Sequence, residues 1–247
     1  MIYSQTIETP SYLCDVDDRL HTWAAVRLCQ EVTEYHGNAT GIGFQTLLAQ
    51  RRAWVISHAL YNVYRLPSAF ERITLETWAR GDNGLIAFRD YCVRAEASGE
   101  VLLTGTSHWP LISLDTRRVV RLGDVVKGYS IETRQATAYS QLAKLQLPDM
   151  QGLQPAMSRE VCYAMLDHTQ HVNNSEYIRM LFDHLITRGF DLGTPFSLEV
   201  NYAHESRLGD GLQLYHVGQS PVHFFRIDNP RGTSVSARVA PVEGAGM

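Results

Sequence analysis

In the second half of the chain, apolar residues recur at the spacing of one helical face between about residues 175 and 188. The residues of this stripe are Tyr177, Ile178, Leu181, Phe182, Leu185 and Ile186. Such spacing predicts an amphipathic helix with one buried side. Either Asn173 or Asn174 is suited to cap its N-terminus, and Gly189 is suited to end it.

The first half contains a matching pattern between about residues 22 and 36. Its apolar stripe consists of Ala25, Leu28, Cys29, Val32 and Tyr35. Gly37 follows this stripe directly, so we expect the helix to end there. A shorter helix is expected at about residues 44–50.

Runs rich in apolar and β-branched residues follow each predicted helix and are separated by turn-forming residues. In the first half these strand-like runs are residues 54–64, 72–80, 87–95 and 101–112. In the second half they are residues 196–202, 212–217, 223–227 and 234–239. An early strand is also expected before each helix, near residues 2–7 and 158–165.

A five-residue pattern stands just before each helix: Asp17-x-x-x-His21 before the first and Asp167-x-x-x-His171 before the second, an offset of 150 residues. The same order of elements follows both patterns, which predicts a tandem repeat. Within each copy a sheet must cover the apolar stripe of the helix, because neither surface is stable alone in water. The predicted fold class is therefore α+β, a tandem (double) hotdog in which each half is an antiparallel sheet wrapped around a long helix.

The stretch from about residue 122 to residue 155 has few periodic apolar residues and is expected to connect the halves across the outside. This gives an N-terminal hotdog at residues 1–125, a linker at 126–155 and a C-terminal hotdog at 156–247.

Composition narrows the function classes. The formal charge is −4, from 22 basic and 26 acidic residues, which argues against a nucleic-acid-binding protein. No apolar run approaches the roughly 20 residues that span a bilayer, and the N-terminus lacks a secretory signal. The cysteines, which are Cys14, Cys29, Cys92 and Cys162, have no metal-ligand spacing. We expect a cytoplasmic protein with free thiols, no membrane span and no metal.

The segment from Asp167 to Tyr177, DHTQHVNNSEY, resembles the D-x-N-x-H-V-N-N-x-x-Y signature of plant and bacterial acyl-carrier-protein (acyl-ACP) thioesterases. Further resemblances are the sequences RAWV at 52–55, RLP at 65–67, SHWP at 107–110, DTRR at 115–118, EVNY at 199–202 and HES at 204–206. Together they extend from about Thr6 to Val239 and cover most of the chain.

The resemblance implies a double hotdog that hydrolyses fatty acyl-ACP to free fatty acid and holo-ACP, without metal or organic cofactor. The expected partner is an acyl carrier protein bearing a fatty acyl-phosphopantetheine. The C-terminal hotdog would be catalytic and the N-terminal one would hold the acyl chain, with Phe44, Trp54 and Ile56 among the residues that set its depth. Two hotdogs in one chain already form a pseudo-dimer, so a monomer and a homodimer are both open.

By position, Asp167 and His171 match active-site residues of the family. Glu205 matches a carboxylate expected on a following strand, and Ser206 stands where plant members often carry a cysteine. Thr169 stands where the family usually has asparagine, so that residue's role does not transfer directly. Threonine keeps a hydroxyl donor and acceptor but lacks the amide.

Thioester hydrolysis needs an attacking group and donors for the developing oxyanion. Asp167 is a candidate general base or nucleophile, and the sequence leaves both open. His171 would orient water or the carboxylate, and Glu205 would fix the imidazole tautomer or share the base role. The N–H groups that begin the second helix, with Asn173 and Asn174, would form the oxyanion site.

Other interpretations remain. Asp167 and His171 are also typical of a helix start and a turn, and Glu205 of an exposed strand end. Ser206 has no G-x-S-x-G elbow around it, which argues against a serine nucleophile. An acyl-CoA thioesterase, a non-catalytic acyl-binding module, and a hydratase or dehydratase are alternatives, although the last class resembles D-x-x-x-x-H, one residue longer than here. The arginines at 51–52 and 117–121 are typical of solvated charges, with an acidic carrier protein as a second explanation.

Overall fold

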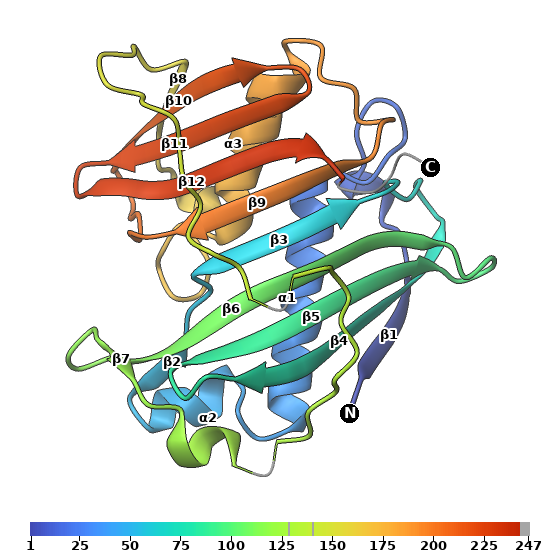
Figure 1. Ribbon diagram of the computed structural model, residues 1–247, viewed down its shortest axis with the longest axis vertical. Helices are drawn as coiled ribbons and strands as arrows, with labels where there is room; N and C mark the ends of the chain where they lie inside the picture. The colour runs from blue at the N-terminus through green and yellow to red at the C-terminus, as the bar shows by residue number, and fades with distance from the viewer. Residues whose placement is uncertain (128, 140, 243–247) are drawn as a thin grey trace.

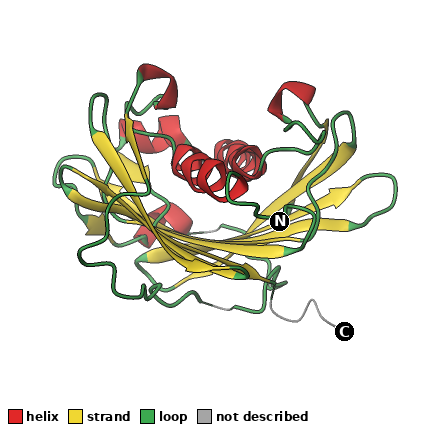
Figure 2. Ribbon diagram, turned by 90° about the horizontal axis from the view of Figure 1, so that it is seen from above, coloured by secondary structure: helices red, strands yellow, loops and turns green. Residues whose placement is uncertain are grey.

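The computed structural model describes residues 1–127, 129–139 and 141–242. Within them, one antiparallel sheet runs in the order β1-β4-β5-β6-β3-β9-β12-β11-β10-β8, with short strands β2 and β7 paired to β6. The sheet curves around two long helices that lie side by side on its concave face (Figures 1 and 2). The predicted α+β class is confirmed.

The first half supplies one long helix and the strands that surround it. Its helices are η1 (Ser11–Leu13), α1 (Thr22–Ala39), α2 (Phe44–Ala49) and η2 (Gly123–Val126). Its strands are β1 (Tyr3–Glu8), β2 (Arg52–Trp54), β3 (His58–Val63), β4 (Arg72–Asp82), β5 (Ile86–Ala95), β6 (Val101–Ser113) and β7 (Val119–Val120).

The second half repeats this order in a shorter form. Its helices are η3 (Tyr163–Met165) and α3 (Asn174–Ile186). Its strands are β8 (Met157–Glu160), β9 (Phe196–Tyr202), β10 (Gly211–Gln219), β11 (Val222–Asn229) and β12 (Gly232–Pro241). Alternate residues of β9 and β11 are buried, which is the period-two pattern of a strand with one face on a core.

The two halves are joined by pairing of β3 with β9 over six residues each, with Tyr61 opposite Leu198. Both of these side chains are fully buried in one core that also contains residues of α1 and α3. The halves therefore share one sheet and the main hydrophobic core, and a smaller cluster of Leu47, Leu111 and Leu122 lies in the first half.

Three predicted boundaries were wrong. Helix α1 does not end at Gly37 but continues to Ala39. A Cβ atom at Gly37 would lie 3.2 Å from Gly43 Cα, so this glycine serves close packing inside the helix. The strand predicted at 54–64 is divided into β2 and β3, opposite Pro110, which has no N–H for the ladder. The strand predicted at 158–165 ends at Glu160 and is followed by η3.

The chain between η2 and β8 crosses the outer face of the sheet (Figure 1). Side chains of the sheet hold its backbone at successive points. Trp78 Nε1 donates to Arg134 O at 2.8 Å, and Ala136 N donates to Asp90 Oδ2 at 2.8 Å. Further along, Leu142 N donates to His108 Nε2 at 3.3 Å, and Leu145 N donates to Asn201 Oδ1 at 2.9 Å. Asp90 and His108 belong to the first half and Asn201 to the second, so the crossing segment spans both.

The repeat is real, but its predicted register was wrong by two residues. Helices η1 and α1 begin at residues 11 and 22, whereas η3 and α3 begin at 163 and 174, an offset of 152. Before α1, Asp15 N donates to Arg19 O at 2.7 Å; before α3, Asp167 N donates to His171 O at 2.9 Å. Asp15 and Arg19 are therefore the structural counterparts of Asp167 and His171.

The residues chosen from the sequence have other counterparts. Asp17 occupies the place of Thr169, and His21 is the N-cap of α1 just as Asn173 is the N-cap of α3. A D-x-x-x-H match at an offset of 150 was thus a coincidence of composition within two homologous turns.

Candidate active site

The turn before α3 is a compact loop closed by backbone hydrogen bonds. Besides the bond from Asp167 N to His171 O, Gln170 N donates to Asp167 O at 3.0 Å. Gln170 has a φ of 65°, a left-handed conformation that reverses the chain. Leu166 and Val172 form a β-bridge at the base of the loop. The side chains of Asp167 and His171 are consequently held on the same turn.

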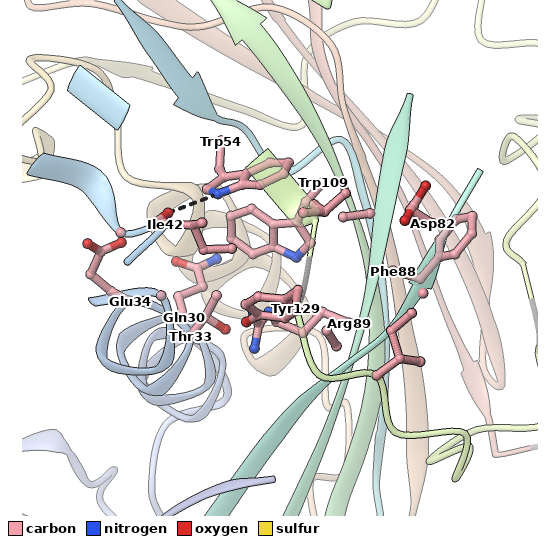
Figure 3. A pocket seen from close by; sticks show the side chains of 17 residues that line it. Gln30, Thr33, Glu34, Ile42, Trp54, Asp82, Phe88, Arg89, Trp109 and Tyr129 are labelled. Atoms are coloured by element: carbon pink, nitrogen blue, oxygen red, sulfur yellow. Dashed lines mark hydrogen bonds between the residues drawn. The ribbon is translucent and has the colours of Figure 1, made fainter. Parts of the chain in front are cut away.

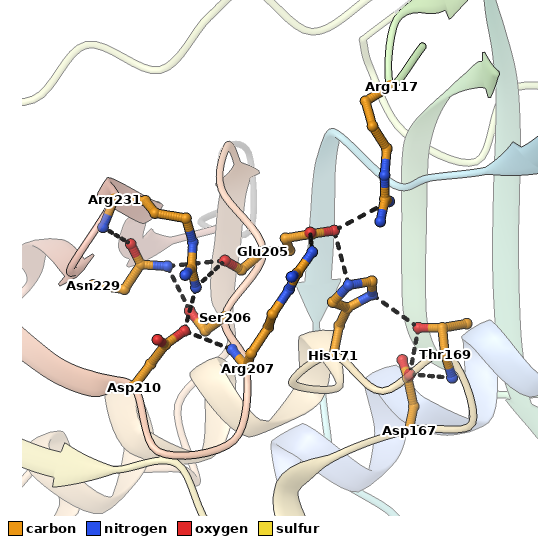
Figure 4. A network of polar contacts seen from close by, with 10 residues as sticks. All are labelled: Arg117, Asp167, Thr169, His171, Glu205, Ser206, Arg207, Asp210, Asn229 and Arg231. Atoms are coloured by element: carbon orange, nitrogen blue, oxygen red, sulfur yellow. Dashed lines mark hydrogen bonds and ion pairs between the residues drawn. The ribbon is translucent and has the colours of Figure 1, made fainter. Parts of the chain in front are cut away.

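Thr169 connects these two side chains (Figure 4). Its backbone N–H donates to Asp167 Oδ1 at 2.8 Å, and its hydroxyl lies 2.5 Å from the same oxygen. The hydroxyl oxygen is also 3.2 Å from His171 Nδ1. The residue that departs from the family signature therefore lies between the two residues that match it.

Glu205 completes the cluster from the loop between β9 and β10, not from a strand as predicted. The chain leaves the sheet after Tyr202, and Glu205 Oε2 comes within 3.0 Å of His171 Nε2. Asp167, Thr169, His171 and Glu205 thus form one continuous polar chain, with a carboxylate at each end and the imidazole inside it.

Two arginines contact Glu205, and their role was not apparent from the sequence. Arg207 Nη2 lies 2.5 Å from Oε1, and Arg117 Nη1 lies 3.6 Å from Oε2 (Figure 4). Partial burial acts to raise the pKa of Glu205, but Arg207, His171 and Arg117 outweigh it, and the pKa is held below its ordinary value. Arg117 comes from the first half, so no local sequence pattern links it to this site.

Ser206 lies next to Glu205 in the chain, but its side chain is fully buried. Asn229 Nδ2 donates to Ser206 Oγ at 2.9 Å, and Ser234 Oγ lies 3.1 Å away on the other side. Asn229 Nδ2 also donates to Glu205 O at 2.9 Å. The structure therefore places Ser206 in an interior polar cluster that supports the backbone of the Glu205 loop.

Asn173 caps α3. Its Oδ1 accepts from Ser175 N at 3.0 Å and from Ser175 Oγ at 2.7 Å. Its backbone oxygen accepts from Glu176 N at 2.9 Å. The N–H groups of Ser175 and Glu176 are therefore already bonded, and Asn174 carries the remaining N–H of the first three in the helix.

Arg27 of α1 holds the start of α3 from the other half. Its Nε donates to Ser175 Oγ at 2.9 Å, and its Nη2 donates to Glu176 Oε1 at 3.0 Å. The Glu176 side chain is only 5% exposed, whereas that of Arg27 is 42% exposed. The helix that carries the polar chain is thus fixed to the helix of the first half.

A cavity of about 90 Å³ lies in the first half between α1 and the sheet (Figure 3). Its wall is largely apolar and aromatic and includes Ile42, Trp54, Phe88, Trp109 and Tyr129. Trp54 Nε1 donates to Ile42 O at 3.1 Å, which fixes the indole in the wall. Such an apolar and aromatic lining is typical of sites that bind apolar ligands.

One ring contact connects the segment that lines the cavity with the turn that carries Asp167. Gly43 lines the cavity, and the next residue, Phe44, packs edge-on against His168 with ring centroids 4.4 Å apart. His168 directly follows Asp167. Within the described residues, no cluster of three or more His, Cys, Asp or Glu side chains has the arrangement of a metal site.

A buried cation lies in the cavity wall. Arg89 Nη1 is 3.0 Å from His36 Nδ1 and donates to Thr77 Oγ1 at 3.1 Å, while Nη2 donates to Tyr129 Oη at 3.0 Å. Burial lowers the pKa of His36 to about 4, and the charge of Arg89 acts in the same direction. His36 is therefore a neutral acceptor for the guanidinium at neutral pH.

The family model of the acyl-ACP thioesterase N-terminal domain matches residues 1–129, and that of the C-terminal domain matches residues 155–226. The chain belongs to the acyl-ACP thioesterase family. None of the helices within the described residues is both long and apolar enough to cross a membrane.

Named relatives of this thioesterase-family chain include plant proteins. Oleoyl-acyl carrier protein thioesterase 2 of Arabidopsis thaliana is 26% identical over 239 residues, which cover 89% of this chain and 64% of that protein. A dodecanoyl-(acyl-carrier-protein) hydrolase of Umbellularia californica is 29% identical over 223 residues, covering 83% and 56% respectively. The chain thus spans about half to two thirds of the length of these relatives.

Solved structures agree on the fold. The 12:0-ACP thioesterase of Umbellularia californica superposes with a TM-score of 0.83 at 22% identity, covering 97% of this chain and 96% of that one. An acyl-ACP thioesterase of Bacteroides thetaiotaomicron also gives 0.83, at 19% identity and 97% coverage of both chains. The double hotdog predicted from the sequence is confirmed.

Proposed function

We propose that this protein hydrolyses the thioester of fatty acyl-ACP and releases free fatty acid and holo-ACP, the step that ends chain growth in fatty acid biosynthesis. The observation that carries the proposal is the polar chain Asp167–Thr169–His171–Glu205, built from the turn before α3 and the loop after β9. An apolar cavity in the first half, connected to that turn through Phe44, supports it. Membership of the family supports the same reaction.

Asp167 is the group that initiates attack. Thr169 occupies Oδ1 with two hydrogen bonds, which leaves Oδ2 for the attacking water or, in a covalent route, for the thioester carbon. His171 is held between Thr169 and Glu205, and the anionic Glu205 accepts from Nε2–H. This arrangement fixes the imidazole orientation in the way the triad of other hydrolases fixes its own.

The oxyanion is assigned to the N-terminus of α3. Because Asn173 already satisfies the N–H groups of Ser175 and Glu176, the Asn174 N–H is the donor assigned to the thioester oxygen. The positive end of the helix dipole favours the developing negative charge there. Loss of such a donor typically reduces the rate about 100- to 1,000-fold.

The two halves divide the work. We assign acyl-chain binding to the hotdog at residues 1–125, where Trp54 lines the cavity, and catalysis to the hotdog at 156–247, joined by the linker at 126–155. The acyl carrier protein would deliver the chain on its phosphopantetheine. We place the reaction in the cytoplasm, with no nucleic acid and no cofactor, and both a monomeric pseudo-dimer and a homodimer satisfy this scheme.

The test offers the purified protein acyl-ACPs of several chain lengths and measures release of the free thiol. We expect turnover that Asp167→Asn reduces at least about 100-fold. The matched control is Asp15→Asn, which alters the equivalent turn of the first half and should retain activity. Absence of thiol release from every acyl-ACP by folded protein contradicts the proposal.

The same assay separates the alternatives. Matched acyl-CoA substrates report which carrier is preferred, through the ratio of the two kcat/KM values. Acyl-chain binding without turnover identifies a non-catalytic binding module. Equal activity of Asp167→Asn and wild type removes Asp167 from the site.

A further inference from the structure

The hydroxyl of Thr169 lies between two groups that compete for its single hydrogen (Figure 4). An ionised carboxylate only accepts hydrogen bonds, and a hydroxyl donates one hydrogen while accepting others. If Asp167 Oδ1 takes that hydrogen, the contact of 3.2 Å to His171 Nδ1 is satisfied only when Nδ1 itself carries a hydrogen. The protonation states of Asp167 and His171 are therefore linked through one oxygen atom.

With Nε2–H donated to Glu205, two arrangements satisfy both contacts, and each holds the same number of protons. In one, Asp167 is a carboxylate, the Thr169 O–H donates to it, and an imidazolium Nδ1–H donates to Oγ1. In the other, protonated Oδ1 donates to Oγ1, whose O–H donates to a neutral Nδ1. The exchange breaks the Nδ1–H and one Oγ1–H bond and forms one Oγ1–H and the Oδ1–H bond, with no change in total charge.

We propose that Thr169 is a proton relay between Asp167 and His171, so that the two residues share one proton and act as a single acid–base unit. The proposal rests on the proposed function, because it assigns a path within the same site. When the proton is on His171, Asp167 is ionised and ready to attack. Thr169 acts through its two neighbours and is a positioning residue.

The charges around Glu205 keep a hydrogen on Nε2 of His171, so only the protonation of Nδ1 changes. Glu205 faces Nε2 of His171 at 3.0 Å and is itself contacted by Arg117 and Arg207. An anionic Glu205 accepts Nε2–H in both arrangements. The proton exchanged within the unit is consequently the one between Oδ1, Oγ1 and Nδ1.

The equivalent turn of the first half cannot share a proton in this way. Asp17 stands in the place of Thr169, and Arg19 in the place of His171, and the two form an ion pair. A guanidinium stays protonated and a carboxylate side chain offers no hydroxyl between acceptors. An asparagine, which the family usually has at the position of Thr169, offers N–H donors but no atom that both accepts and donates a proton. The relay thus belongs to this chain's own threonine.

The experiment compares wild type with Thr169→Ser, which retains the hydroxyl, and Thr169→Val, which removes it at nearly the same size. NMR of protein with 15N-labelled histidine, assigned with His171→Gln, follows the titration of His171 without any substrate. We expect Thr169→Val to lower its midpoint by about half to one pH unit, because the imidazolium loses its acceptor. Thr169→Ser should match wild type.

The second measurement is the pH profile of thiol release from acyl-ACP. Thr169→Val should lower kcat about 100-fold and change the shape of the profile, while KM stays within about twofold; Thr169→Ser should do neither. A Thr169→Val protein with the wild-type titration and pH profile overturns the relay. If no variant or wild type releases thiol, the proposed function fails, yet the NMR titration still decides the relay.

Discussion

The contact between Arg27 and the start of α3 gives the sharpest prediction for stability. Replacing Arg27 with Met keeps an unbranched apolar side chain at this position and removes the guanidinium, whose Cζ lies 5.2 Å from the centroid of the Trp23 ring. The change deletes the hydrogen bonds to Ser175 Oγ and Glu176 Oε1 and leaves a carboxylate that is 5% exposed. The remaining cation is Arg179, whose Nη1 is 3.7 Å from Oε2.

The burial of the Arg27–Glu176 ion pair sets the size of the expected loss of stability. Breaking a fully buried ion pair costs about 3–5 kcal/mol, and the partial exposure of Arg27 reduces this. We expect Arg27→Met to lower the free energy of unfolding by about 2–3 kcal/mol, a fall in Tm of about 5–10 °C for a chain of this size. Because α3 carries the active-site turn, kcat should fall as well.

Urea denaturation followed by circular dichroism measures this free energy. Arg179→Met is the matched control, because its side chain is as exposed as that of Arg27 but lies farther from Glu176, at 3.7 Å, so its removal should cost less than about 1 kcal/mol. The double variant Arg27→Met with Glu176→Leu removes both charges and should recover at least half of the loss. A loss below about 0.5 kcal/mol for Arg27→Met, or a double variant less stable than the single one, would refute the reasoning.

Further predictions concern charge, pH and packing. Arg207→Gln should raise the pKa of Glu205 toward its ordinary value and move the acidic limb of the pH–rate profile to higher pH; an unmoved limb contradicts the assignment. Burial, ahead of nearby charges, lowers the pKa values of His36 and His108 to about 4, so the unfolded chain binds more protons between pH 6.5 and 4. The free energy of unfolding should therefore be highest above about pH 6.5. Between about pH 6.5 and pH 4 it should fall by about 1.4 kcal/mol per pH unit for each histidine, which urea denaturation at several pH values would measure. Gly37→Ala gains helix propensity of about 1 kcal/mol but crowds the neighbouring loop, so we expect weaker acyl-ACP turnover without higher Tm; a clear rise in Tm would show that the loop yields freely.

Local periodicity predicted the elements well because most strands and both long helices bury one face. The run at residues 196–202 coincides with β9, and the stripe near residues 175–188 with α3. Boundaries failed where a distant contact decides them. Glycine is a residue type that commonly ends helices, yet at Gly37 the absence of a side chain allows the helix to pack closely against a loop.

The sequence predicted the part of the site whose residues lie on one turn. Asp167, Thr169 and His171 are three positions of a single loop, and the structure brings them together. Arg207 lies two residues from Glu205 in the same loop, whereas Arg117 contacts Glu205 only because the sheet brings a first-half loop beside a second-half loop. No spacing along the chain encodes that proximity.

The pairing of β3 with β9 has a consequence for how such a site changes over time. In an assembly of two identical chains, any substitution appears in both copies of a turn at once. Here each turn is encoded separately, so the two can differ: Arg19 stands in the first turn at the place that His171 has in the second. Covalent duplication thus removes the symmetry constraint, and a single mutation can alter one site and leave its twin intact.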